Sequence, residues 1–255
     1  MDNLELLSPV GNAISYFGAV AESEGLASQT PIAQFAYPLG MVFAYLTMLV
    51  ILAEGLSRII PEDPELTRKV VHIGSGNVIL LAWWLNISTE VIVSAAVIAA
   101  LIALTSYFIP ILPSIESVGR KSLGTLFYAI SIGLLAACFW QHNPQYTAIG
   151  ILIMAWGDGM AAIIGQRWGK HTYQVFEITK SWEGSLAMAG VSYLVSVAIL
   201  LSVQGNSWQV WLISLAVAIV ATILEAFSKL GIDNLTVPLG SAVLCFLCVQ
   251  AISFN

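Results

Sequence analysis

Carboxylates and cations gather in a few short stretches of an otherwise apolar chain, and one of these stretches surrounds Asp158. This residue stands between Gly157 and Gly159 in an apolar segment, and Lys180 and Glu183 follow within 25 residues. Keeping an ionisable side chain inside a membrane costs at least ~2.5 kcal/mol on insertion scales, so such a residue indicates function. Where lipid meets water, carboxylates can hold Mg²⁺ while Lys and Arg bind phosphate oxygens. The pattern therefore predicts phosphoryl or nucleotidyl transfer at this boundary.

A second polar stretch, TRKVVHIGSGN, covers residues 67–77 at the start of another apolar segment. At helical spacing Arg68, His72 and Ser75 share one face, which places a cation beside an imidazole. A hydrogen-bonded core histidine is the structural alternative for His72.

The third stretch is GRKSLGTLFY, residues 119–128, in which Lys121, Thr125 and Tyr128 fall on one helix face. Arg120 and Lys121 stand where a helix is expected to begin. The free N–H groups and the dipole of a helix N-terminus add to the side-chain charge and suit phosphate. Snorkelling of the two side chains to the interface is the structural alternative.

The fourth stretch is EAFSKLGIDNLTVPLGSA, residues 225–242. Glu225 ends an apolar segment, and Asp233 and Asn234 form a short link before Pro238. Asp-Asn before proline is also typical of a plain turn. Together with Asp158 and Glu183, Glu225 and Asp233 nevertheless make four carboxylates on the face predicted to carry the cations.

The composition indicates the elements that must position these residues. Hydrophobic residues make up 58% of the chain and charged residues 9%, with a mean hydropathy of +0.86. This composition excludes a soluble domain and predicts an all-α, polytopic membrane bundle in a single domain, residues 1–255. Since about 20 apolar residues cross a bilayer, we expect eight transmembrane helices, near 35–54, 72–87, 90–110, 123–141, 146–165, 185–203, 208–227 and 237–253.

The positions of the cations predict the orientation of these helices. All nine Lys and Arg residues fall in or beside the links after the first, third, fifth and seventh expected helices. By the positive-inside rule that face is cytoplasmic. Both termini, including the N-terminal segment 1–34, are then exoplasmic, and the site faces the cytoplasm.

Five ordered stretches resemble the family of membrane phytol kinases and polyprenol or dolichol kinases, and within it the phytol kinases of cyanobacteria and plastids. They are TRKVVHIGSGN, GRKSLGTLFYAIS, WGDGMAAIIGQRWGK, TKSWEGSLAM and DNLTVPLGSA, and they define a catalytic core from 67 to 242. The resemblance implies transfer of a phosphate from CTP or UTP to a long isoprenoid alcohol, most of all phytol or geranylgeraniol. The product, phytyl phosphate, would feed tocopherol and chlorophyll synthesis. A plasma or thylakoid membrane of a cyanobacterium-like source is the implied location.

The resemblance also implies roles for individual residues. The residues that it carries over are Arg68, Lys69, His72, Arg120, Lys121, Ser122, Asp158, Lys180, Glu183, Gly184, Ser185, Asp233 and Asn234. Asp158 and Asp233 are expected to hold Mg²⁺, while Lys121 and Lys180 are expected to clamp the triphosphate. Either His72 or a carboxylate would position the alcohol.

Two other readings remain as alternatives. A phosphatidate cytidylyltransferase would use the same metal and CTP but would release pyrophosphate. A transporter would use Asp158 as an ion site, but the chain shows no convincing internal repeat. The expected partners are a nucleoside triphosphate, a prenyl alcohol dissolved in the membrane and the bilayer itself, with no nucleic acid. The sequence leaves a homo-oligomer open.

Overall fold

The computed structural model describes residues 31–108, 123–176 and 178–252. Contacts divide the chain into two units, Met1–Ala44 and Tyr45–Asn255. The described part of the first unit is the beginning of one helix. All further elements belong to the second unit.

Six helices among the described residues are long and apolar enough to cross a membrane. They are Ala36–Ile59, Thr89–Phe108, Pro144–Trp168, Trp182–Gln204, Trp208–Ala226 and Asp233–Ala251. The first lies within α2 (Pro31–Ile59), and the second and the last three are α5, α9, α10 and α11. A shorter apolar helix, Gly124–Trp140, comprises α6 (Gly124–Leu135) and η2 (Ala136–Trp140). The all-α, multi-helix membrane architecture is therefore confirmed.

The expected count of eight spans is not confirmed, because the second expected span is divided. In its place the chain forms α3 (Pro64–Gly76) and α4 (Val78–Trp84), with Asn77 between them. The sequence Gly74-Ser75-Gly76-Asn77 explains the interruption, because glycine and polar residues favour helix ends over helix interiors. Neither helix reaches the length of about 20 residues that a span requires.

The centre of the bundle is the long helix Pro144–Trp168, which has three parts. They are α7 (Pro144–Leu152), the π-helix η3 (Ile153–Asp158) and α8 (Gly159–Trp168). In the most apolar 18-residue stretch of this helix, 61% of the residues are buried. This share is larger than in the corresponding stretch of each of the other five long helices. Ile149, Ile153 and Met154 are fully buried there, and α9, α10 and α11 supply further core residues.

A small antiparallel hairpin follows α8, where the sequence predicts only a link between two helices. Its strands are β1 (Thr172–Val175) and β2 (Ile178–Ser181), paired so that Thr172 is opposite Ser181 and Tyr173 opposite Lys180. Alternating aromatic and β-branched residues in TYQVFEIT suit a short ribbon. The hairpin therefore fixes the position of Lys180 relative to α9.

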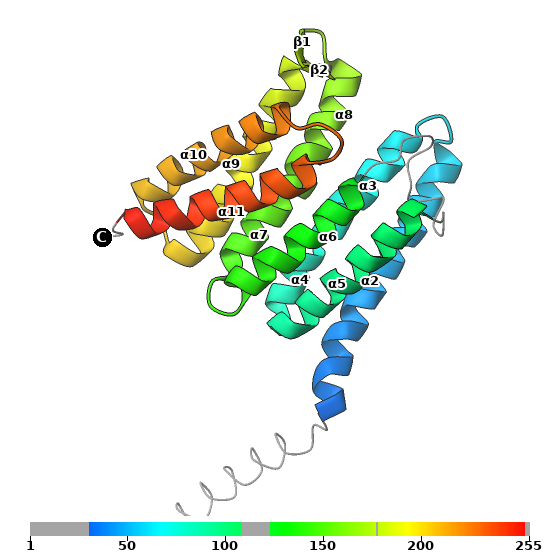
Figure 1. Cartoon of the computed structure of the whole chain (residues 1–255), viewed down its shortest axis with the longest axis vertical. Coiled ribbons are helices and arrows are strands. Elements are labelled where there is room, and N and C mark those ends of the chain that lie inside the picture. The colour runs from blue at the N-terminus through cyan, green and yellow to red at the C-terminus, as the bar shows by residue number, and fades with distance from the viewer. Residues whose placement is uncertain (1–30, 109–122, 177, 253–255) are drawn as a thin grey trace, which may run out of the picture. The chain divides into compact units, whose positions relative to one another are not determined.

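Helix ends and turns of the second unit form two groups, one at each end of the bundle, as Figure 1 shows. The hairpin, the end of α8, the start of α3 and the turn from α10 to α11 lie at one end. The turns from α4 to α5, from η2 to α7 and from α9 to α10 lie at the other. The described links that carry Lys and Arg therefore share one end of the bundle, in agreement with the predicted segregation of charge.

Candidate active site

The central contact of the site is an ion pair between α3 and η3. Lys69 Nζ lies 2.7 Å from Asp158 Oδ2, although 89 residues separate the two in sequence. Only 10% of the Lys69 side chain and 15% of the Asp158 side chain are exposed. Each charge therefore requires the other, because an unpaired charge is costly to hold away from water.

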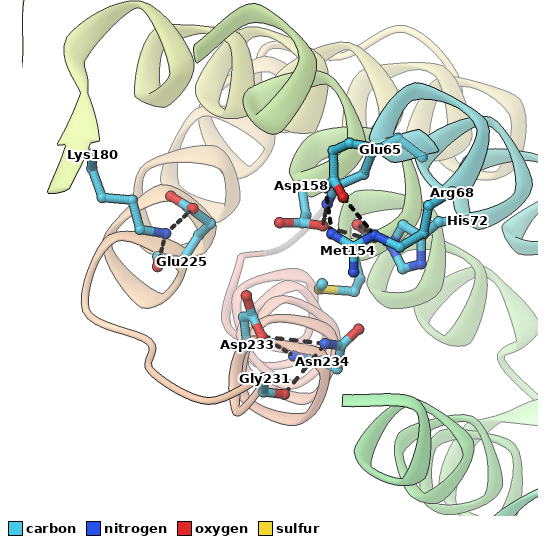
Figure 2. Close-up of polar contacts among 11 residues, drawn as sticks. Glu65, Arg68, His72, Met154, Asp158, Lys180, Glu225, Gly231, Asp233 and Asn234 are labelled. Atoms are coloured by element: carbon cyan, nitrogen blue, oxygen red, sulfur yellow. Dashed lines mark hydrogen bonds and ion pairs between the residues drawn. The ribbon is translucent and has the colours of Figure 1, made fainter. Parts of the chain in front are cut away.

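His72 belongs to the same contact region. It lies one helical turn after Lys69 on α3, and its Nε2 is 3.8 Å from Asp158 Oδ2 and 3.4 Å from the carbonyl oxygen of Met154. The imidazole therefore faces both the carboxylate and the backbone of η3. Figure 2 shows His72, Met154 and Asp158 gathered at this contact.

The local backbone explains how Asp158 is presented. It is the last residue of η3, and π-helical turns are frequent at functional sites. Its neighbours are glycines because other helices come close on both sides. A Cβ at Gly157 would lie 2.6 Å from Met188 Sδ, and one at Gly159 would collide with Ile73. Small residues here let α9 and α3 pack tightly around the carboxylate.

A second ion pair joins the hairpin to the end of α10. Lys180 Nζ contacts the Glu225 carboxylate and also donates to the Glu225 backbone carbonyl at 3.1 Å. Glu225 is buried, with 5% of its surface exposed. From the sequence, Glu225 was one of the four carboxylates expected on this face, with no assigned role in the site. A carboxylate at the end of an apolar helix was the available signal.

The third part of the site is the start of α11. Asp233 Oδ1 accepts hydrogen bonds from the backbone N–H of Asn234 at 3.0 Å and from its side-chain amide at 3.2 Å. The same amide also donates to the Gly231 carbonyl at 3.3 Å. Gly231 has a φ of 84°, which glycine adopts without strain. Asn234 thus stabilises the turn that presents Asp233.

These three parts form one group of charges, which we call the carboxylate–lysine cluster: Lys69, Asp158, Lys180, Glu225 and Asp233. In Figure 2 Asp158, Asp233 and the Lys180–Glu225 pair lie around a common centre. Asp158 and Asp233 are close enough to interact electrostatically, and Glu225 interacts with both. The cluster contains three carboxylates and two lysines from α3, η3, β2, α10 and α11.

The cluster fits Mg²⁺ only if a ligand completes the coordination. No three or more His, Cys, Asp or Glu side chains in the described part of the chain are grouped so that they could hold a metal ion. Protein-bound Mg²⁺ commonly uses one or two carboxylates together with substrate phosphates and water. Asp158 and Asp233 are the two carboxylates that we expect to take part in such a site.

Two further residues predicted for the site, Glu183 and Ser185, make their contacts at the hairpin and not in the carboxylate–lysine cluster. Glu183 binds the ring and backbone N–H of His171, with 2.7 Å between His171 Nδ1 and Glu183 Oε1. Ser185 Oγ and Tyr173 Oη are 2.6 Å apart. These contacts fasten the hairpin to the first turn of α9 and do not bring Glu183 or Ser185 to Asp158.

Gly184 and Arg68 also have structural contacts. A Cβ at Gly184 would lie 2.9 Å from the Ala161 carbonyl, and the Gly184 N–H donates to Ser181 Oγ at 3.2 Å. Arg68 forms an exposed ion pair with Glu65 on its own helix. The remaining predicted phosphate-binding residues, Arg120, Lys121 and Ser122, lie outside the described residues.

A surface ion pair ties α3 to α8 beside the cluster. Asp63 caps α3 by accepting from the Leu66 N–H at 2.9 Å, and Arg167 reaches it at 2.9 Å from the end of α8. The Arg167 guanidinium and the Leu66 N–H hold the pKa of Asp63 below its usual range. The contact helps to align the helices that carry Lys69 and Asp158.

Comparisons with known proteins agree with the resemblance. No protein-family model matches the chain, and no solved structure matches it. Over 208 residues it is 54% identical to the phytol kinase of Synechocystis sp., covering 81% of this chain and 89% of that protein. It is 32% identical to phytol kinase 1, chloroplastic, of Arabidopsis thaliana over 220 residues, 78% of this chain and 71% of that one. A probable phytol kinase 1, chloroplastic, of Glycine max is 31% identical over 233 residues, 82% and 72% of the two chains. The chain therefore belongs to the phytol kinase family.

Proposed function

We propose that this protein is a phytol kinase, which transfers a phosphate from CTP, or UTP, to the hydroxyl of phytol or geranylgeraniol. The observation that carries the proposal is the carboxylate–lysine cluster inside a membrane bundle whose sequence belongs to this family. Phytyl phosphate is a precursor suited to tocopherol and chlorophyll synthesis, which we propose as its use. A polyprenol or dolichol kinase is the variant of the same reaction with a longer acceptor.

The reaction requires one bond to form and one to break. The alcohol oxygen attacks the γ-phosphorus, the bond from that phosphorus to the β–γ bridging oxygen breaks, and the nucleoside diphosphate leaves. The alcohol proton passes to a nearby base, for which His72 is the candidate, with its Nε2 3.8 Å from Asp158 Oδ2. Mg²⁺ held by Asp158 and Asp233 would neutralise charge on the phosphate oxygens.

Lys69 and Lys180 are the described cations placed to bind phosphate in this cluster. Each is paired with a carboxylate, so a triphosphate must compete for it. Such an exchange is favourable for a nucleotide that brings its own divalent cation, because the carboxylates then keep a positive partner. Lys121 is proposed to assist from the segment outside the described residues.

Product analysis tests this function. The purified protein in lipid nanodiscs is incubated with Mg²⁺ and γ-labelled or α-labelled CTP and UTP against phytol, geranylgeraniol, farnesol and dolichol. We expect label from the γ-position in a prenyl phosphate and release of CDP or UDP. Release of pyrophosphate with phosphatidate as acceptor would instead establish a cytidylyltransferase, and a preference for dolichol would establish the longer-chain kinase.

A further inference from the structure

The hydroxyl of Tyr128 is a buried polar group that takes no part in the carboxylate–lysine cluster. Tyr128 lies on α6, and its oxygen is inaccessible to solvent and has no hydrogen-bond partner among the residues that the structure describes. Buried polar groups nearly always have a partner in folded proteins, so an unpaired one requires an explanation. A phenylalanine would fill the same volume without this penalty.

The surroundings of this hydroxyl place it beside the candidate active site. The Tyr128 ring packs on the imidazole of His72, with 5.4 Å between the ring centroids. A Cβ at Gly76 would lie 3.5 Å from the Tyr128 hydroxyl oxygen and would collide with Ala155. Since Ala155 belongs to η3, the hydroxyl lies where α3 meets the π-helix that ends at Asp158.

The same helix also borders the lipid. Ile130 and Leu134, further along α6, are exposed apolar residues of a membrane bundle. Tyr128 therefore connects an apolar, lipid-facing helix to the polar group of His72 and Asp158. A long-chain alcohol needs this combination, because its tail remains among apolar side chains while its hydroxyl must reach the phosphate.

We propose that the Tyr128 hydroxyl binds the hydroxyl of the acceptor alcohol and positions it beside His72. This inference rests on the proposed function. The phenol donates a hydrogen bond to the alcohol oxygen, and the alcohol's own O–H can then turn toward the His72 imidazole. Tyr128 thereby adds a substrate-binding residue to those expected from the sequence.

The test uses Tyr128→Phe in the full-length protein in nanodiscs, with Tyr146→Phe as the matched control. Tyr146 is also a buried tyrosine, but it packs against Phe139 and Phe246 in the core. Binding of labelled phytol and of phytene, the hydrocarbon that lacks the hydroxyl, is measured without nucleotide. Thermal unfolding and the KM for the nucleotide are measured in parallel.

We expect Tyr128→Phe to weaken phytol binding about tenfold, the scale of one lost hydrogen bond. Its affinity for phytene and its KM for the nucleotide should stay at wild-type values, and its unfolding temperature should not fall, because the lost hydroxyl has no partner among the described residues. In Tyr146→Phe both affinities and the KM should stay at wild-type values. Unchanged phytol binding, or an equal loss for phytol and phytene, would overturn the proposal. If the wild-type protein phosphorylates no alcohol, the proposed function fails, while the binding comparison still decides the role of Tyr128.

Discussion

Asp158 has two tasks that must be separated, because it both pairs with Lys69 and is the proposed metal ligand. The pair is largely buried, and removing one partner of a buried pair typically destabilises a protein by about 3–5 kcal/mol. Loss of activity in a single variant could therefore reflect unfolding. A second variant that removes both charges resolves the two tasks.

Asp158→Asn should reduce kcat by roughly 10²-fold or more, the scale for losing a key electrostatic group in a transition state. The change keeps the size of the side chain and removes its charge. Turnover is measured against Mg²⁺ concentration, with the folded fraction determined by size-exclusion chromatography and thermal unfolding.

The matched variant is Lys69→Met with Asp158→Asn, which leaves no unpaired charge. It should recover the thermal stability lost in Asp158→Asn without recovering turnover. If turnover returns with stability, Asp158 serves only to neutralise Lys69, and Lys69 itself is not needed to bind phosphate. If Asp158→Asn alone retains more than about a tenth of wild-type turnover at saturating Mg²⁺, Asp233 becomes the leading metal candidate.

The sequence identified most residues of the carboxylate–lysine cluster, but it did not show which of them pair with one another. Asp158, Asp233 and Lys180 could be selected because charge in an apolar chain is rare, whereas Lys69 was expected from the family resemblance. Glu225 could not be paired with Lys180 beforehand, since 45 residues and a complete helical hairpin separate them. Contacts of this kind depend on the choice of helices that pack together. The spacing of residues along the chain does not specify that choice.

At the scale of the elements, the contact of α8 with α9 positions the hairpin and Lys180. Gly165 and Gly184 lie at this contact: a Cβ on Gly184 would be 2.9 Å from the Ala161 carbonyl and 3.3 Å from Gly165 Cα. The obstructing atoms are backbone atoms, so they cannot move aside as a flexible side chain could. Gly184 therefore has a packing role whatever its part in nucleotide binding.

Gly184→Ala should lower stability by about 1–3 kcal/mol, the usual cost of overpacking. Gly190→Ala on the same helix is the control, because a Cβ at Gly190 has no atom within 4 Å. Thermal unfolding in one detergent compares them, and Gly190→Ala should match or exceed the wild type because alanine favours helix. Equal unfolding temperatures for the two variants would show that α8 and α9 can separate at little cost.

The sequence predicts the long apolar helices better than the short elements. Long apolar segments such as 208–226 agree with expectation because hydropathy and length are sufficient for a span. The hairpin Thr172–Ser181 was not foreseen, although its alternating residues were visible, because so short a ribbon is stable only when it packs on a helix. Residues 74–77 interrupt the second expected span with glycine and polar side chains, and the chain divides there into α3 and α4.

For the whole molecule, the segregation of Lys and Arg determines how we expect the bundle to lie in the membrane. The described cations lie in or beside the links after α2, α8 and α10, at the end of the bundle that holds the hairpin. The positive-inside rule predicts that this end is cytoplasmic. The candidate active site, with Lys180 on the hairpin, would then meet cytoplasmic nucleotide.

Cysteine labelling checks this orientation in a variant that lacks the three native cysteines. A Gln174→Cys change in the hairpin should react with an impermeant maleimide only after cells are permeabilised. His142→Cys, in the turn from η2 to α7 at the other end, should react in intact cells. Labelling of the hairpin position in intact cells would reverse the topology.

The long separation of Lys69 from Asp158 has a consequence for biosynthesis. A ribosome must add 89 residues after Lys69 before its counter-charge exists, and α3 is too short and too polar to insert as an independent span. Only when the central helix through Asp158 is in place can α3 pack against it. The site is then completed last, when α10 and α11 deliver Glu225 and Asp233.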